Sequence, residues 1–144
     1  MEQFADYGHA IVAMAATAGF GLLVNPFTAV AKMNRGHAAG GTPAEDYGDK
    51  TYRFNRAYLN LTEIMGFFVA ATVAAILAGA NPTWVNWLAA IFFVARLAHF
   101  GVHYAGIGPM NFGPRTFIFV VRRACCLILV LMAIAALVCA CPKV

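Results

Sequence analysis

Long apolar segments dominate the pattern of the chain, and polar residues interrupt them at only a few points. A membrane-spanning helix needs about 20 mainly apolar residues. The segments that meet this requirement lie at approximately 7–33, 56–78, 83–104 and 115–140. Glycine and proline clusters at 79–82 and 106–114 separate the later segments. The pattern predicts an all-α fold, a four-helix transmembrane bundle that forms one domain over 1–144 with a polar loop at 34–52.

Composition supports a membrane protein. Of the 144 residues, 62% are hydrophobic and only 11% are charged, and the mean hydropathy is +0.72. Soluble domains carry about 25% charged residues. The net charge is +4, but the basic residues are few and scattered around apolar runs, so nucleic acid is not an expected partner. Glu2 and Asp6 stand where a signal peptide would carry lysine or arginine, so we expect the first apolar segment to be retained.

Loop charges predict how the bundle is oriented. The basic residues at the first loop and its edges are Lys32, Arg35, Lys50, Arg53 and Arg56, whereas the opposite side has only Lys143. The positive-inside rule then places the first and third loops in the cytoplasm and both termini on the opposite side.

Ionisable residues inside the apolar segments gather at one end of the predicted bundle. They are Arg53, Arg56, Asn60 and Glu63 in the second segment, Arg96, His99 and His103 in the third, and Arg115, Arg122 and Arg123 in the fourth. Spacings of three and four place the members of the first two sets on one helix face each. Because successive helices alternate in direction, all three sets reach the cytoplasmic end. Several arginines here face the single acid Glu63, and this excess predicts an anionic ligand.

Individual residues also have simpler interpretations. Arg53 and Arg115 could be interfacial cations that reach toward the lipid headgroups, and Glu63 could be a counter-ion for an arginine on another helix. His99 could be a neutral packing residue, and Arg122 or Arg123 could form an interhelical ion pair or contact lipid headgroups. A small anion channel is a further possibility, although it would place basic residues at several depths.

Other chemistries are poorly supported by the residue types. His99 and His103 are four residues apart and could share a metal, but no cysteine or clear carboxylate accompanies them, so no metal is expected. The chain contains no serine, which removes serine nucleophile triads. All four cysteines lie in the last segment, at Cys125, Cys126, Cys139 and Cys141, and are interpreted as small apolar side chains.

The second segment opens with the pattern R-x-x-R-A-x-x-N-x-x-E at residues 53–63, and the third carries V-A-R-L-A-H at 94–99. With Arg115 opening the fourth segment, these motifs resemble the MAPEG family, the membrane-associated proteins in eicosanoid and glutathione metabolism. The resemblance implies a homotrimer that binds glutathione between neighbouring subunits, in a site open to the cytoplasm and the lipid. It assigns glutathione binding to Arg35, Arg53, Arg56, Asn60, Glu63, Arg96, His99, His103 and Tyr104. It assigns Arg115 to stabilisation of the glutathione thiolate.

The chain also departs from the family pattern. His103 stands where members commonly have tyrosine, with Tyr104 adjacent, and Gly66 stands where many have proline. The segment before Arg115 is longer than in the eicosanoid synthases. These differences favour a general glutathione transferase that conjugates hydrophobic electrophiles, a detoxification activity. The alternatives are a glutathione-dependent peroxidase for lipid hydroperoxides and a non-catalytic, lipid-binding member of the same fold.

Overall fold

The computed structural model describes residues 2–108 and 112–140, and its regular structure over those residues is entirely helical. A short 3₁₀ helix, η1 (Glu2–Tyr7), precedes four α-helices: α1 (Gly8–Met33), α2 (Lys50–Leu77), α3 (Pro82–Ala105) and α4 (Pro114–Ala140). All four α-helices are long and apolar enough to cross a membrane. The predicted all-α, four-helix membrane fold is therefore confirmed.

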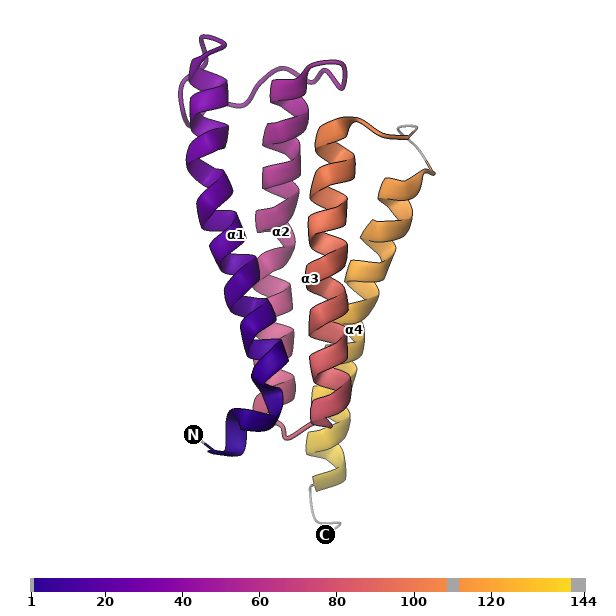
Figure 1. The fold of residues 1–144 in the computed structure, drawn as a ribbon. Coiled ribbons are helices and arrows are strands. Elements are labelled where there is room, and N and C mark those ends of the chain that lie inside the picture. The colour runs from indigo at the N-terminus through magenta and orange to yellow at the C-terminus, as the bar shows by residue number, and fades with distance from the viewer. Residues whose placement is uncertain (1, 109–111, 141–144) are drawn as a thin grey trace.

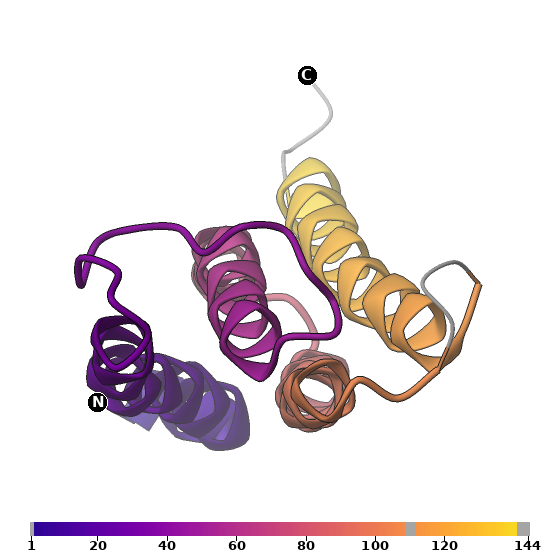
Figure 2. The same ribbon diagram turned by 90° about the horizontal axis from the view of Figure 1, so that it is seen from above.

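The helices alternate in direction, so the α1–α2 and α3–α4 connections lie at one end of the bundle (Figure 1). The start of α1 and the last turns of α4 lie at the other end. Helices α1 and α4 each pack on both α2 and α3, and they do so from opposite sides of the α2–α3 pair (Figure 2). The face of α2 and α3 that meets α4 is therefore separate from the face that meets α1.

Helix boundaries follow local capping. The Asp49 side chain accepts hydrogen bonds from the backbone N–H groups of Thr51 and Tyr52, both at 3.2 Å. This cap starts α2 at Lys50, earlier than the predicted 56, so the predicted loop 34–52 is too long and the polar connection ends at Asp49. Helix α3 has Asn81 as its cap with Pro82 in the first turn, and it ends at Gly106, where φ is +72°. Helix α1 contains Pro26 and continues through it to Met33.

Asn86 on α3 holds the N-terminal end of α1. Its amide nitrogen donates to the backbone oxygen of Asp6 at 2.7 Å, and its amide oxygen accepts from the backbone N–H of Ala10 at 2.9 Å. The first N–H groups of a helix have no partner within the helix, and Asn86 supplies one from another part of the chain. Nearby, the hydroxyl of Tyr7 donates to the backbone oxygen of Ala80, in the α2–α3 turn.

The centre of the bundle is an apolar layer between α2, α3 and α4. The rings of Phe68 and Phe92 are fully buried and stack with centroids 3.8 Å apart and planes 7° apart. Leu129 and Ala133 of α4 belong to the same buried cluster. Phe92 lies one turn before Arg96 on α3, so this layer directly underlies the polar residues at the loop end.

Candidate functional site

A buried cluster joins α2, α3 and α4 at the depth of Asn60. The side-chain oxygen of Asn60 (Oδ1) accepts hydrogen bonds from Nη1 of Arg96 and from Nη2 of Arg122, each at 3.0 Å. Arg96 also donates through Nη2 to the backbone oxygen of Ala57 at 3.2 Å. Both arginines have 0% exposed surface, whereas Asn60 is partly exposed. Three of the residues expected at this end of the bundle, one from each helix, therefore meet at Asn60.

The charge of this cluster is not balanced by acidic residues within the part of the chain that the structure describes. There, the only ion pairs between a basic and an acidic side chain are Arg56 with Glu63, at 2.9 Å, and Arg35 with Asp49, at 3.5 Å. Nε of Arg96, and both Nε and Nη1 of Arg122, are buried without a hydrogen-bond partner among the described residues. Buried cations without a counter-charge are unfavourable, so the cluster is suited to an anionic ligand.

Glu63 and Arg56 form the outer edge of the site. Their side chains are 52% and 38% exposed. An exposed ion pair contributes little to stability, so either residue can exchange its partner for a charged ligand group at small cost. The interpretation of Glu63 as a counter-ion holds for Arg56 on its own helix, rather than for an arginine on another helix.

Two histidines extend the polar surface from the cluster toward the loops. His99 and His103 are buried, and their rings stack with centroids 5.8 Å apart. Within the described residues, Nδ1 of His99 and Nε2 of His103 have no hydrogen-bond partner. Each ring therefore has a buried nitrogen whose hydrogen-bonding capacity is not used by the described residues. His103, rather than the adjacent Tyr104, is the residue of α3 that joins this surface.

Tyr47 from the α1–α2 loop also belongs to the site and was missed by the sequence analysis. Its ring centroid lies 6.0 Å from that of His103 and 5.1 Å from that of Tyr52. The guanidinium carbon of Arg115 lies 5.8 Å from the centre of the Tyr47 ring, and Nη2 of Arg115 donates to the backbone oxygen of Gly108 at 2.9 Å. Tyr47 thus connects α3 to the start of α4. An aromatic residue in a Gly- and Pro-rich loop carries no periodic signal that would have indicated this position.

Arg53 is engaged by the backbone of the chain itself. Its Nε donates to the backbone oxygen of Tyr104 at 3.0 Å, and its Nη1 donates to those of Tyr47 and Gly48 at 2.6 and 2.9 Å. These bonds join the loop to the C-terminal end of α3. The geometry favours a role for Arg53 in holding the loop over the site.

Arg35 and Tyr104 lie away from the buried cluster. Arg35 is 62% exposed and pairs with Asp49. The pKa of Asp49 lies below its ordinary value, because its carboxylate accepts hydrogen bonds from the backbone N–H groups of Thr51 and Tyr52. The nearby Arg35 and Arg53 lower this pKa further. The exposed ring of Tyr104 lies against Phe54, with centroids 5.3 Å apart.

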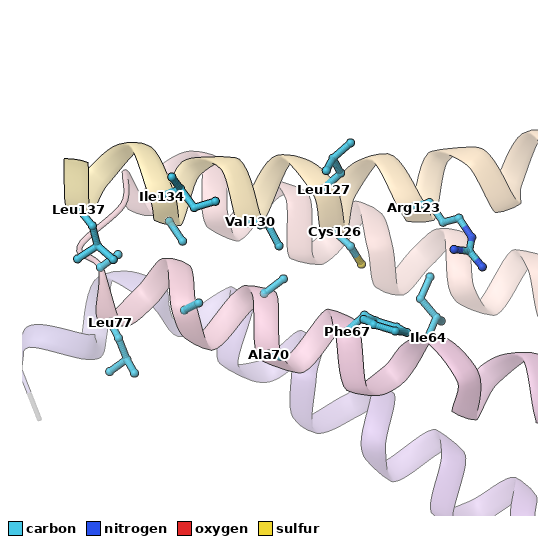
Figure 3. Close-up of a pocket in the computed structure, with 14 residues that line it drawn as sticks. Ile64, Phe67, Ala70, Leu77, Arg123, Cys126, Leu127, Val130, Ile134 and Leu137 are labelled. Atoms are coloured by element: carbon cyan, nitrogen blue, oxygen red, sulfur yellow. The ribbon is translucent and has the colours of Figure 1, made fainter. Parts of the chain in front are cut away.

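An apolar groove of about 840 Å³ runs between α2 and α4 (Figure 3). Ile64 and Arg123 lie at one end and Leu77 and Leu137 at the other. The Arg123 guanidinium is exposed and lies 4.4 Å from the centre of the Phe119 ring. Small residues leave this space open between the helices: Ala70, Ala71, Ala74, Ala78 and Ala133. The sequence analysis did not predict the groove, because a pattern of alanines in an apolar helix is equally compatible with close packing.

The remaining residues that could carry chemistry are potential metal ligands and the cysteines. Within 2–108 and 112–140, no three His, Cys, Asp or Glu side chains come together as a potential metal site. Cys125 and Cys126 are buried, and Cys139 is exposed. Cys141 lies outside the described residues. The buried pair agrees with the interpretation of these cysteines as packing residues.

Comparison with known proteins gives a match to a family model. A search of curated proteins finds no significant match. The sequence model of the MAPEG family matches residues 10–135, which is nearly the whole chain and includes every residue of the buried cluster. The chain is thus an integral-membrane protein that belongs to the MAPEG family.

Proposed function

We propose that this protein is a membrane-bound glutathione transferase, which joins the sulfur of glutathione to hydrophobic electrophiles. The observation that carries the proposal is the pair Arg96 and Arg122, two fully buried guanidinium groups that no acid among the described residues neutralises. A ligand that supplies negative charge would remove this imbalance, and family membership makes glutathione the first candidate.

The residues present fit the groups of glutathione. The tripeptide carries two carboxylates, one ammonium group and one thiol. Arg56 and Arg96 offer donors for carboxylates, because guanidinium groups bind carboxylates with two parallel hydrogen bonds. Glu63 is the acid that can accept from the ammonium group, and its exposed position lets it leave Arg56 to do so.

Arg115 is the residue that we assign to the thiol. It lies in the first turn of α4, where the helix dipole adds partial positive charge to that of the guanidinium. Positive charge near a thiol favours the thiolate and lowers the thiol pKa from about 8.5. When glutathione is bound, its thiolate supplies the nucleophile: a sulfur–carbon bond forms, and a leaving group such as chloride departs with the bonding electrons.

The apolar groove provides a path for the second substrate. It opens between α2 and α4, and Arg123 at one end of it is the next residue in the chain after Arg122 of the polar cluster. An electrophile dissolved in lipid could reach the sulfur along it without crossing water. We further propose that the loop end of the bundle, with the site, faces the cytoplasm and that the chain assembles as a homotrimer. Native mass spectrometry in detergent tests the assembly, and labelling of single cysteines placed in the loops tests the orientation.

The decisive experiment measures glutathione binding and turnover by purified protein in detergent. We expect saturable binding at millimolar concentration or below, thiolate formation seen by ultraviolet difference absorbance, and conjugation of a chloronitroaromatic substrate. Arg115→Gln should reduce turnover and thiolate formation strongly while leaving glutathione binding measurable. The matched control is Lys50→Gln, which removes an exposed cation at the same end of the bundle.

Two outcomes would contradict the proposal. Absence of glutathione binding at millimolar concentration would remove the substrate assignment and favour a lipid-binding role. Unchanged turnover in Arg115→Gln would remove the catalytic assignment of that residue. A lipid hydroperoxide assayed alongside the aromatic substrate shows whether reduction exceeds conjugation.

A further inference from the structure

The orientation of the Asn60 amide is determined by two cations. A side-chain amide has an oxygen that only accepts and an NH₂ group that only donates. At Asn60, donors from α3 and α4 point at the same atom, each at 3.0 Å. Rotating the amide by half a turn would place its NH₂ group against both guanidinium groups and break two charge-assisted hydrogen bonds. The atom between Arg96 and Arg122 must therefore be the oxygen.

The NH₂ group of Asn60 is consequently directed away from the two arginines. It donates to no residue within the described part of the chain, while the oxygen on the other side of the same amide accepts two hydrogen bonds. Both arginines are completely buried, but Asn60 is partly exposed. The open side of this residue therefore carries a donor.

Arg122 contributes something that Arg96 alone does not. Arg96 is itself held to α2, because it donates to both Asn60 and the backbone oxygen of Ala57. Arg122 comes from α4, so its bond to Asn60 connects α2 to the helix that also carries Arg115, seven residues earlier. Two donors from different helices restrict the amide more than one donor could.

We propose that Arg122 is a positioning residue: together with Arg96 it holds Asn60 so that its NH₂ group faces the ligand. This inference rests on the glutathione site proposed above. It predicts that the part of glutathione that docks at Asn60 is a hydrogen-bond acceptor, a carboxylate or a peptide carbonyl, and that the ammonium group docks elsewhere. A purely structural Arg122 would join α4 to α2 without affecting the ligand.

Asn60→Asp separates the two sides of the amide. Aspartate keeps an acceptor for both arginines, so the thermal midpoint in detergent should stay the same or rise. It lacks the NH₂ donor, and loss of one hydrogen bond to a charged acceptor lowers affinity by about tenfold or more. The loss should persist at about 1 M salt, where the screening length is about 3 Å. A decrease in affinity that disappears at high salt would instead indicate charge repulsion.

Arg122→Met tests the positioning directly and also decides the matter if Asn60→Asp prevents folding. We expect KM for glutathione to rise more than kcat falls, and Arg122→Lys to restore part of the affinity. The control is Lys50→Met, which removes an exposed cation at the same end of the bundle and should leave glutathione affinity unchanged.

Three outcomes would overturn the inference. The first is an Asn60→Asp protein that binds glutathione as tightly as the wild type. The second is an Arg122→Met protein with a lower thermal midpoint but unchanged affinity. The third is an equal effect of Arg122→Met and Lys50→Met on affinity. If the wild type fails to bind glutathione, the proposed function and this inference both fail. If the wild type binds glutathione, any of the three outcomes in the variants removes this inference alone.

Discussion

Replacing Arg53 by methionine tests whether this arginine holds the loop over the site. The change keeps an unbranched side chain but removes donors to three backbone oxygens, those of Tyr47, Gly48 and Tyr104. A typical hydrogen bond contributes about 0.5–1.5 kcal/mol net, so loss of the three should remove about 1.5–4.5 kcal/mol of local stability from the loop. This corresponds to roughly a 10- to 1,500-fold increase in loop opening, at tenfold for each 1.4 kcal/mol.

Hydrogen–deuterium exchange measures this opening at two amides of the loop. The N–H of Gly48 donates to the Asp46 side chain at 2.7 Å, and that of Asp49 donates to the Asp46 backbone oxygen at 3.1 Å. Both should exchange faster in Arg53→Met by the factor above. The N–H of Gly79 in the α2–α3 turn, bonded at 3.0 Å to Ile76, provides an internal reference at the opposite end.

Arg35→Met is the matched control for this experiment. Arg35 also contacts the loop region, but through one exposed ion pair at 3.5 Å, and pairs of this kind contribute little. Equal exchange in wild type and Arg53→Met, or equally fast exchange in the two variants, would refute the anchoring role. Glutathione affinity should fall with loop opening in Arg53→Met, because Tyr47 would no longer be held beside His103.

Further predictions concern the edge of the site, the cap of α2 and the core. Glu63→Gln should weaken glutathione binding by about tenfold or more through loss of a charged partner, measured by calorimetry; unchanged affinity would exclude the assigned contact. The pKa of Asp49 is lowered in the folded chain, so its ionised form stabilises the fold above the unfolded value of about 3.9, and this stability is lost as the pH falls through the lower folded value. Asparagine at this position would still cap the helix but would not titrate, so a series of thermal midpoints in acid should depend less on pH in Asp49→Asn; an identical pH dependence would contradict this. Phe92→Ala removes one member of a fully buried stack and should cost about 3–5 kcal/mol, measured by denaturant titration in mixed micelles; a loss below that of a typical surface change would show that the stack is not a core contact.

The fold could be predicted because the relevant signals are local in the sequence. A spanning helix is recognised by its length and lack of charge, and the alternation of helix direction then places Arg96 and Asn60 at one end. Spacings of three and four were enough to assign each polar residue to a helix face. The start of α2 was placed too late because Asp49 caps the helix from within a polar segment, where periodicity gives no signal.

The site could be predicted only in part, because periodicity says which face a side chain occupies but not what it meets across the bundle. Nothing in the residues around Arg53 indicates that it bonds to the loop and the end of α3 rather than to a ligand. The same holds for Arg122, for which the sequence suggested an ion pair or a lipid contact, and whose partner is the neutral amide of Asn60. Tyr47 and the alanine-lined groove depend on how the helices and loop are placed in space.

The hydrogen bonds made by Asn86 and Tyr7 limit when the N-terminal end of α1 can reach its final structure. The N–H of Ala10 finds its acceptor on a residue 76 positions later in the chain, and Tyr7 finds its own 73 positions later. These acceptors lie in the α2–α3 turn and in α3, so the beginning of α1 gains the two hydrogen bonds only after synthesis has passed Asn86. The N-terminal end of α1 can therefore adopt this hydrogen-bonded structure only in a chain whose third helix is in place.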